Sequence, residues 1–247
     1  MDELILREDK EGICTLTLNR PEHLNALNLA SFHQLNFLVS RLTLEADLIH
    51  CVILRGAGRS FCAGADLKDR ESGDAIIATR AFKGTVIKSL ANLPMPVIAA
   101  VHGHCMTGGL EFALAADIII AAESAIFADT HGKWGLVSSW GLTQRLPRRV
   151  GMAKAKEMMF SSRRYSAREA EYLGLVNFCV ADAELESETW KLARDISKNS
   201  AHTNKSYKRL LLDTESLPLD AGLAWEFHNH PGSAPDVQDR ISTFKPR

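Results

Sequence analysis

Two glycines followed by a glutamate, Gly108, Gly109 and Glu111, form the segment whose residue types and spacing best suit catalysis. An apolar run typical of a helix follows the glycines. Their backbone N–H groups are therefore expected at a helix N-terminus, where they are unpaired and attract anions. Glycine also leaves no Cβ between such an N–H and a ligand oxygen. Glu111 falls one turn after Gly108, and helical side chains lean toward the N-terminus. The spacing predicts a carbonyl-polarising N–H and an acid/base carboxylate at one point.

The same spacing is also typical of a helix cap. A glutamate at the third helical position often accepts a hydrogen bond from the backbone N–H of its own N-cap residue. Glu111 fits that role as well as an acid/base role, so its spacing from Gly108 leaves both interpretations open. A second glycine-bearing segment of the chain favours the catalytic interpretation.

This second segment follows a predicted strand at 51–55 and runs from Gly56 to Lys68 with the sequence GAGRSFCAGADLK. Together the two segments resemble the crotonase family, also called the enoyl-CoA hydratase/isomerase family. The matching motifs are LNRP at 18–21, NAL at 25–27, FCAGADL at 61–67, AAVHG at 99–103, GGLE at 108–111 and TQRL at 143–146. Several ordered motifs at family-like spacing make the resemblance more specific than any one of them. It covers nearly the whole chain and weakens after about Lys198.

The resemblance implies an enzyme that acts on acyl thioesters of coenzyme A and stabilises a thioester enolate. In the family, two backbone N–H groups hold the enolate oxygen, and by position they correspond to Ala65 and Gly108. The physical reason is independent of the resemblance. Negative charge develops on one oxygen, and two fixed N–H dipoles stabilise it without reorganisation. Ala65 and Gly108 are therefore expected to form an oxyanion hole.

Family hydratases move protons with two glutamates, and only the first of them matches here. By resemblance it corresponds to Glu111, whereas the second position holds His131. Neutral imidazole can accept a water proton and imidazolium can donate one near pH 7. A Glu–His pair also avoids the repulsion between two carboxylates. We expect Glu111 and His131 to share the acid/base work. The alternative is that His131 only packs its loop against Trp134.

Further positions are expected to bind the substrate. The resemblance implies that the backbone around Leu24 and Ala63 lines the path of the adenine and pantetheine groups. It also implies that Lys68 contacts coenzyme A phosphates, the alternative being an ordinary exposed lysine. Ser139 stands where the family's turn usually has glycine. Its hydroxyl can hold a water or substrate group, or it can cap the next turn.

Two tryptophans and two aspartates complete the candidate positions. Trp134 and Trp140 are expected to narrow the acyl pocket, or else to serve as ordinary core or interface aromatics. Asp66 and Asp117 match motif positions, and we interpret both as structural, through caps or turn hydrogen bonds.

No metal and no separate cofactor are expected. His102, His104 and Cys105 are close in the sequence, as are His228 and His230, but neither group has the paired spacing of zinc ligands. The resemblance implies that coenzyme A enters as part of the substrate.

Composition argues against several other classes of protein. The chain has 247 residues, 46% of them hydrophobic, with 29 basic and 30 acidic residues and a formal net charge of −1. Nothing in this balance indicates binding to nucleic acid or to an anionic membrane. Five scattered cysteines, mostly within apolar runs, are typical of reduced, buried thiols. The chain start lacks a signal-peptide pattern, and the longest apolar run, 112–122, is too short to span a bilayer. We expect a cytoplasmic protein.

The elements that must position these residues alternate between strand and helix. Strands are predicted at 4–7, 13–18, 51–55, 97–101 and before Ala122, and helices at 28–45, 74–90, after Gly108, and at 152–160, 167–172, 183–198 and 203–214. Asn28 or Ser31 is expected to cap the first helix. A polar linker is expected at 69–73. The segment 129–140 has no clear period, and long unpatterned loops are often functional.

This alternation predicts an α/β fold. The resemblance implies a spiral of ββα units with small perpendicular sheets, a core over residues 1–184 and a C-terminal helical region over residues 185–247. It further implies that the C-terminal helices cover the site or build a trimer interface, in a homotrimer or a dimer of trimers.

Three functional hypotheses follow. The first is an enoyl-CoA hydratase that adds water across the double bond of a 2-enoyl-CoA, as in fatty acid metabolism. The second keeps the oxyanion hole but catalyses double-bond isomerisation, decarboxylation or thioester hydrolysis. The third is a non-catalytic acyl-CoA-binding protein that keeps only the fold. Retention of Ala65, Gly108 and Glu111 argues against the third hypothesis.

Overall fold

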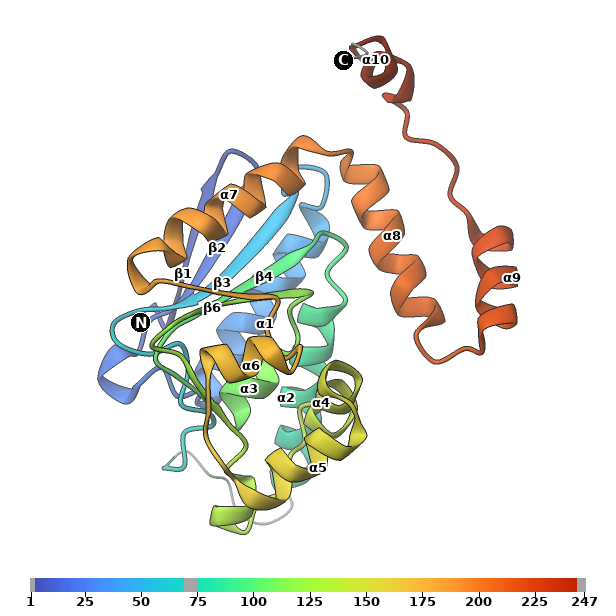
Figure 1. Ribbon diagram of the computed structural model, residues 1–247. Coiled ribbons are helices and arrows are strands. Elements are labelled where there is room, and N and C mark those ends of the chain that lie inside the picture. Colours follow the sequence, from blue (N-terminus) through green and yellow to red (C-terminus); the bar gives the residue numbers. More distant parts are fainter. Residues whose placement is uncertain (1–2, 69–74, 244–247) are drawn as a thin grey trace.

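The computed structural model describes residues 3–68 and 75–243 and has a mixed α/β architecture, as predicted (Figure 1). The polar linker expected at 69–73 lies outside the described residues. The main sheet has six strands in the order β1-β2-β3-β4-β6-β9. They span Ile5–Lys10 (β1), Ile13–Leu18 (β2), Cys51–Gly56 (β3), Val97–Val101 (β4), Ile118–Ala122 (β6) and Phe178–Val180 (β9).

Both faces of this sheet are buried. β1 and β2 form an antiparallel hairpin, and the remaining neighbours pair in parallel. Successive side chains of a strand point to opposite faces. In β3, Val52 and Leu54 join a large core on one face, whereas Cys51 and Ile53 join a smaller core on the other. Burial on both faces explains why the parallel strands are nearly continuous apolar runs.

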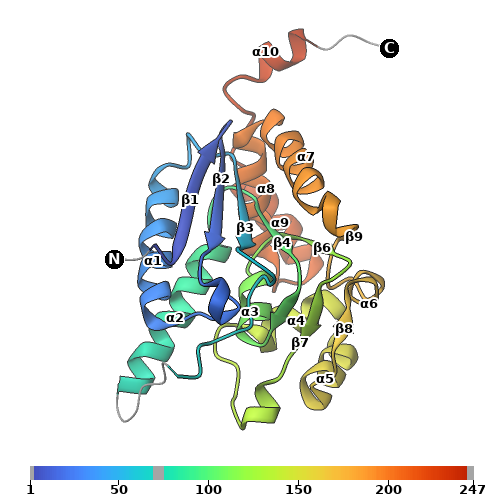
Figure 2. The ribbon, with the colours of Figure 1, turned by 90° about the vertical axis from the view of Figure 1, so that its left-hand side faces the viewer.

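Different helices cover the two faces. α1 (Leu29–Leu44), α2 (Ala75–Ala91) and α3 (Gly108–Ala113) contribute to the large core. α7 (Leu185–Lys198) crosses the opposite face and packs against β2, β3, β4 and β6 (Figure 2). The predicted cap of α1 is confirmed, since Asn28 Oδ1 accepts a hydrogen bond of 2.8 Å from the Ser31 backbone N–H. The helix after Gly108 ends at Ala113.

A second, three-stranded sheet positions the candidate site. It consists of β5 (His104–Met106), β7 (Ile126–Ala128) and β8 (Tyr165–Ser166), in the order β5-β7-β8. β5 and β7 are parallel, with Met106 paired to Ala128. The carboxyl ends of parallel strands meet at one edge, so the residues after β5 and after β7 lie side by side. Those residues are the glycine turn of Gly108 and the segment that contains His131.

The remaining α-helices are α4 (Leu142–Val150), α5 (Met152–Ser161), α6 (Ala167–Tyr172), α8 (Ala201–Thr214), α9 (Leu219–Asn229) and α10 (Val237–Ser242), with short 3-10 turns at Pro21–His23 (η1), His131–Trp134 (η2) and Asp182–Glu184 (η3). Of these α-helices, α5, α6 and α8 were expected. The patterns do not predict α4, α9, α10 or the short strands β5, β7, β8 and β9. Strands of two or three residues are too short to show an alternation, and α4 contains Pro147.

The C-terminal region begins as part of the main body. Leu185 and Ala193 of α7 belong to the smaller core, and Arg194 pairs with Glu11 of the β1–β2 turn at 3.1 Å. α8 is anchored by the buried Lys208, whose Nζ donates to Met95 O at 3.0 Å and to Asp117 Oδ2 at 2.7 Å. Beyond α8 the chain leaves the body.

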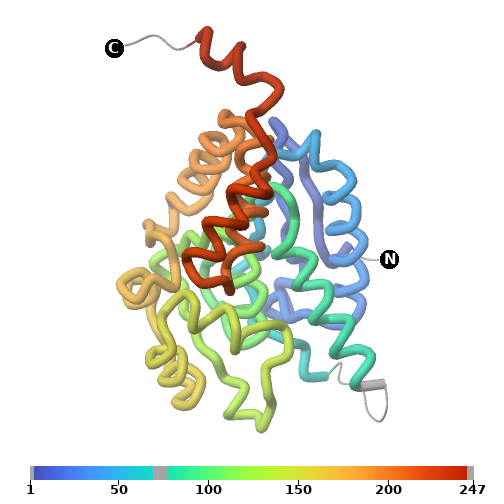
Figure 3. Tube along the Cα trace, turned by 90° about the vertical axis from the view of Figure 1, so that its right-hand side faces the viewer, coloured from blue at the N-terminus to red at the C-terminus, as the bar shows by residue number. Residues whose placement is uncertain are grey.

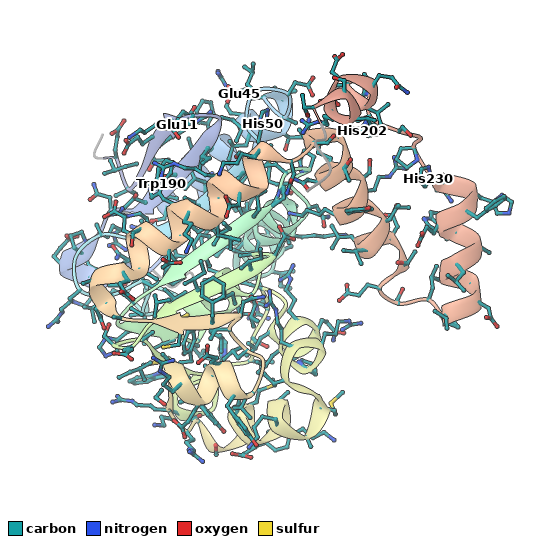
Figure 4. All side chains as sticks on the ribbon, turned by 45° about the horizontal axis from the view of Figure 1, so that its top comes forward. Glu11, Glu45, His50, Trp190, His202 and His230 are labelled. Atoms are coloured by element: carbon teal, nitrogen blue, oxygen red, sulfur yellow. The ribbon has the colours of Figure 1, made fainter. Side chains whose placement is uncertain are left out.

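α9 and α10 extend away from the main sheet (Figures 1 and 3). His202 of α8 contacts the segment that returns from α9, with Nε2 3.1 Å from Gly232 O, and His230 lies at the start of that segment (Figure 4). α8 and α9 expose large apolar side chains, among them Leu211, Leu223 and Phe227. Within the described ranges, no helix combines the length and apolar character needed to cross a membrane.

Candidate active site

The two expected oxyanion donors lie beside each other. The segment after β3 runs along β5, with hydrogen bonds from Cys62 N to His104 O (2.9 Å) and from Met106 N to Cys62 O (3.0 Å). A Cβ on Gly108 would be 3.1 Å from Ala65 N, which places the Ala65 N–H against the start of α3. The backbone N–H groups of Ala65 and Gly108 donate to no residue in the described part of the chain. These two N–H groups, which are unpaired within the described residues, therefore border one cavity.

Gly108 is required by its neighbours. A Cβ at this position would overlap the ring of Trp140, which is buried and packs edge-to-face on Phe32 with ring centroids 4.8 Å apart. Gly64, which precedes Ala65, has a φ of +116°, a backbone conformation that residues with a side chain rarely adopt. The close approach of the two turns therefore requires glycine at both positions. This requirement adds to the access that a glycine N–H gives to a ligand.

Glu111 does not cap its own helix. The N-cap residue of α3 is Thr107, and its backbone N–H donates to Ala128 O at 2.8 Å. The buried Glu111 carboxylate turns instead to the start of α4, where Oε1 accepts from the backbone N–H groups of Trp140, just before the helix (2.7 Å), and of Leu142, its first residue (3.2 Å). The capping interpretation is therefore wrong.

Burial dominates the electrostatics of Glu111. Loss of hydration raises the pKa of this carboxyl above its ordinary value of 4.5, against the opposing effects of the Leu142 and Trp140 N–H groups and of His131. The same two N–H groups hold Oε1 in place. The other oxygen, Oε2, is the one that faces His131. Glu111 is thus a rigidly held carboxyl whose proton affinity is increased.

His131 lies between two carboxylates. Its Nε2 is 3.7 Å from Glu111 Oε2, and its Nδ1 is 2.6 Å from Asp129 Oδ1. The His131 side chain is mostly buried. It comes from η2, directly after β7, whereas Glu111 comes from α3, directly after β5. The parallel pairing of β5 and β7 therefore brings the two acid/base candidates together.

A cavity of about 160 Å³ joins these groups. Six predicted site residues line it: Ala65, Gly108, Glu111, His131, Ser139 and Trp140. Arg80 and Lys83 of α2 line the same cavity. A larger groove of about 740 Å³ between α2, α4 and α8 shares Arg80, Ser139 and Trp140 with it. The catalytic candidates thus open onto a space that can hold an acyl group.

Other predicted binding residues lie outside this cavity. Leu24 and Ala63 are paired by a hydrogen bond of 2.9 Å from Ala63 N to Leu24 O, and Lys68 is exposed. Trp134 is 60% exposed and does not line this cavity, so the structure does not place it with the other predicted site residues. The η2 turn directs His131 inward and ends on Gly135 with Trp134 at the surface.

The predictions for the two aspartates are confirmed. Asp66 Oδ2 accepts two hydrogen bonds of 3.0 Å from the Arg20 guanidinium, which ties the turn after Ala65 to the segment after β2. Asp117 Oδ2 accepts from Val97 N at 2.7 Å and from Lys208. Both carboxylates hold segments together, and Asp66 also lines the cavity of the Glu111–His131 pair, whereas Asp117 does not.

The histidines and cysteines outside the site make local contacts. His102 Nε2 is 2.9 Å from Gly58 O, and His104 Nδ1 is 3.1 Å from Ser60 Oγ. All five cysteines are free and buried, as expected. Over residues 3–68 and 75–243, no group of three or more His, Cys, Asp or Glu side chains could hold a metal ion.

Asp129 is a site residue that the sequence reasoning missed. Its side chain is buried, and Oδ1 contacts both the backbone N–H of His131 (3.1 Å) and the imidazole Nδ1. The Asp-x-His spacing is visible in the sequence, but it becomes informative only once β7 is known to end at Ala128. Arg80 and Lys83 were missed because a helical period does not show which face meets a cavity.

The site combines two backbone N–H groups, unpaired within the described residues, with a carboxyl–imidazole pair. This site on a mixed α/β fold defines an enzyme of the crotonase class. The enoyl-CoA hydratase/isomerase family model matches residues 8–245, and the chain belongs to this family. It is 35% identical to 1,2-epoxyphenylacetyl-CoA isomerase of Escherichia coli over 252 residues, covering 99% of this chain and 96% of the relative. It is also 35% identical to short-chain-enoyl-CoA hydratase of Clostridium acetobutylicum over 242 residues, covering 96% and 92%.

Solved structures confirm the fold. The crystal structure of enoyl-CoA hydratase from Bacillus anthracis superposes with a TM-score of 0.94 at 33% identity, covering 98% of this chain and 96% of that one. A putative enoyl-CoA hydratase from Streptomyces coelicolor gives a TM-score of 0.91 at 26% identity, with 99% and 93% covered. The crotonase fold and an acyl-CoA hydratase/isomerase function are therefore features of this chain.

Proposed function

We propose that the protein hydrates 2-enoyl-CoA thioesters. The observation that carries this proposal is the separation of 3.7 Å between Glu111 Oε2 and His131 Nε2 beside two unpaired backbone N–H groups. That separation is too long for a direct hydrogen bond and suits a bridging water about 2.8 Å from each atom. A water held there lies next to the position that the thioester carbonyl would occupy at Ala65 and Gly108.

The chemistry follows from this arrangement. The thioester oxygen accepts hydrogen bonds from the Ala65 and Gly108 N–H groups, which stabilise negative charge on it. One member of the Glu111–His131 pair removes a proton from the water as the water oxygen bonds to Cβ. The π electrons of the double bond move to the thioester oxygen and give an enolate. The other member then protonates Cα, so that H and OH are added across the bond.

Double-bond isomerisation is the second candidate. The relative named 1,2-epoxyphenylacetyl-CoA isomerase is as similar to this chain as the relative named short-chain-enoyl-CoA hydratase. Isomerisation needs the same enolate but only one base, which Glu111 alone can provide. Decarboxylation and thioester hydrolysis would use the same oxyanion hole. Non-catalytic acyl-CoA binding is disfavoured because such a role needs neither the unpaired donors nor the buried carboxyl.

The substrate supplies its own coenzyme A, and we propose no separate cofactor, nucleic-acid partner or membrane association. In this proposal the adenine and pantetheine groups follow the backbone at Leu24 and Ala63, and Lys68 contacts a phosphate. The proximity of Leu24 to Ala63 supports a continuous path. In this proposal the protein is a cytoplasmic enzyme of fatty acid metabolism, and its five free, buried cysteines support the reducing compartment.

We also propose a homotrimer or a dimer of trimers. The support is the exposure of large apolar side chains on α8 and α9, including Leu211, Leu223 and Phe227. Such side chains are normally covered in a stable soluble protein when they gather on one region. Sedimentation analysis of the full chain tests this proposal directly.

A panel of short-, medium- and long-chain 2-enoyl-CoA and 3-enoyl-CoA thioesters separates the reactions. A hydratase removes the absorbance of the conjugated thioester and gives a product heavier by one water. An isomerase instead creates that absorbance from 3-enoyl-CoA with no change in mass. Loss of conjugated absorbance with a 2-enoyl-CoA is the expected result. Absence of any hydrated product across the panel would contradict the proposed reaction.

A further inference from the structure

We propose that Asp129 is a positioning residue that fixes the tautomer of His131 and leaves Nε2 as the proton acceptor of the site. The inference rests on the proposed hydration reaction and assigns the two proton transfers to particular groups. Its basis is the pair of contacts that one buried oxygen, Asp129 Oδ1, makes to the backbone N–H and to the Nδ1 atom of His131.

The tautomer follows from donor and acceptor chemistry. An ionised carboxylate can only accept hydrogen bonds, so at a distance of 2.6 Å the His131 Nδ1 atom must carry the proton. In the neutral imidazole the other nitrogen, Nε2, then carries the lone pair. Nε2 is the atom that faces Glu111 Oε2 and the cavity. Asp129 thus aims the basic nitrogen at the expected position of the water.

The segment that holds Asp129 is fixed to the oxyanion turn. On one side, Ala128 O accepts from Thr107 N at 2.8 Å. On the other side, the Thr130 N–H and hydroxyl both contact Thr107 Oγ1, at 3.2 Å and 2.5 Å. Thr107 directly precedes Gly108. Because these contacts flank Asp129, the imidazole is oriented relative to the oxyanion hole by a single rigid unit.

This arrangement assigns the proton transfers. His131 Nε2 takes the water proton as the water oxygen bonds to Cβ, and the Asp129 carboxylate stabilises the resulting imidazolium. Glu111, as the carboxylic acid, gives its proton to Cα of the enolate. The imidazolium proton then returns to Glu111 through the solvent or directly across the gap, which restores the site. Among the described residues, the ionisable groups that face His131 or share its cavity are Glu111, Asp129, Asp66, Arg80, Lys83 and, through Glu111, Arg145.

The Asp129→Asn variant tests this role. We expect kcat for hydration to fall by roughly 10- to 100-fold with little change in KM, the loss that is typical when a carboxylate orienting a metal-bound imidazole is removed. In the His131→Gln background the same substitution should lower kcat no further, because Asp129 acts only through the imidazole. Asp182→Asn is the control, since this carboxylate also accepts a backbone N–H, from Ser124 at 3.1 Å, but lies away from the cavity. Wild-type kcat in Asp129→Asn, or an equal further loss of kcat when Asp129→Asn is added to His131→Gln, would overturn the proposal.

Imidazole nitrogen shifts give a second, independent readout. In wild-type protein labelled with ¹⁵N-histidine, the His131 resonances, identified by their loss in His131→Gln, should show a protonated Nδ1 and a bare Nε2. The opposite tautomer would overturn the proposal even if Asp129→Asn does not fold. If the wild type shows the Nδ1–H tautomer but hydrates no enoyl-CoA, the proposed function fails and the positioning by Asp129 stands.

Discussion

Glu111 Oε2 lies 3.7 Å from His131 Nε2, although the two residues come from different strand–turn units. Glu111 follows the short strand β5 and His131 follows β7, and the parallel pairing of these strands places both side chains at one edge. A buried carboxyl and an imidazole at this separation can bracket one water molecule. The relation between these two atoms is the structural basis of the proposed hydratase reaction.

Replacing Glu111 by glutamine should remove a proton-transfer group and preserve the fold. The amide oxygen can still accept from the Trp140 and Leu142 N–H groups, but the amide cannot accept or donate the catalytic proton. We expect kcat to fall by about 10²- to 10⁴-fold, the usual contribution of a general acid or base. Steady-state kinetics with circular dichroism of both proteins provide the measurement. Turnover close to wild type would show that Glu111 is only structural.

The same variant tests the electrostatics of Glu111. Burial raises the native pKa of this carboxyl above 4.5, so between the unfolded and native pKa values the native state binds more protons. The free energy of unfolding of the wild type should therefore decrease as pH rises through that window. Glu111→Gln has no such titration. Urea unfolding at several pH values should show the variant gaining stability relative to wild type as pH increases. The opposite trend would mean that the Trp140 and Leu142 N–H groups lower the pKa of Glu111 by more than burial raises it.

A methyl group at Gly108 should damage the oxyanion hole. The added Cβ of Gly108→Ala would overlap the Trp140 ring, and overpacking of this kind costs about 1–3 kcal/mol. Because the Trp140 N–H also holds Glu111, we expect both thermal stability and turnover to fall. Gly222→Ala in α9 is a matched control, since its Cβ would have no neighbour closer than 3.8 Å. Wild-type turnover in Gly108→Ala would contradict the assigned geometry.

Lys208 should be essential for docking α8. Its buried ammonium donates to the exposed Asp117 carboxylate and to Met95 O, and a hydrogen bond to a charged group is worth about 1.5–3 kcal/mol. Lys208→Ala should therefore lower the stability strongly and increase hydrogen exchange across 201–214. Lys205 lies on the same helix as Lys208 and pairs with the fully exposed Asp47. Its replacement in Lys205→Ala should therefore have a small effect. Equal effects of the two variants would argue against the anchoring role.

Long periodic segments were predictable from the sequence. The apolar strand Val97–Val101 and the amphipathic helix Leu29–Leu44 carry their own pattern, and the Asn28 cap depends only on local geometry. The convergence of Ala65 and Gly108 was predictable through the family resemblance. These features depend on neighbours in the sequence or on motifs of fixed spacing.

Features that depend on tertiary pairing were not predictable. β5 and β7 have three residues each, so no period reveals them, yet their pairing places Asp129 beside His131. Tertiary contacts also determine which of the two tryptophans is buried. Trp140 is drawn into the core by Phe32 and Gly108, whereas the η2 turn leaves Trp134 at the surface. No local pattern distinguishes these two environments.

The most direct test of the central claim is the pH dependence of kcat for 2-enoyl-CoA hydration in wild type and in His131→Gln. If Glu111 and His131 share the proton transfers, the wild-type profile contains a limb that the variant lacks, and the variant hydrates about 10²- to 10⁴-fold more slowly. His131→Glu, which restores a second carboxyl, should recover part of the rate. Hydration by His131→Gln at the wild-type rate and with the wild-type profile would contradict the claim and favour single-base chemistry centred on Glu111.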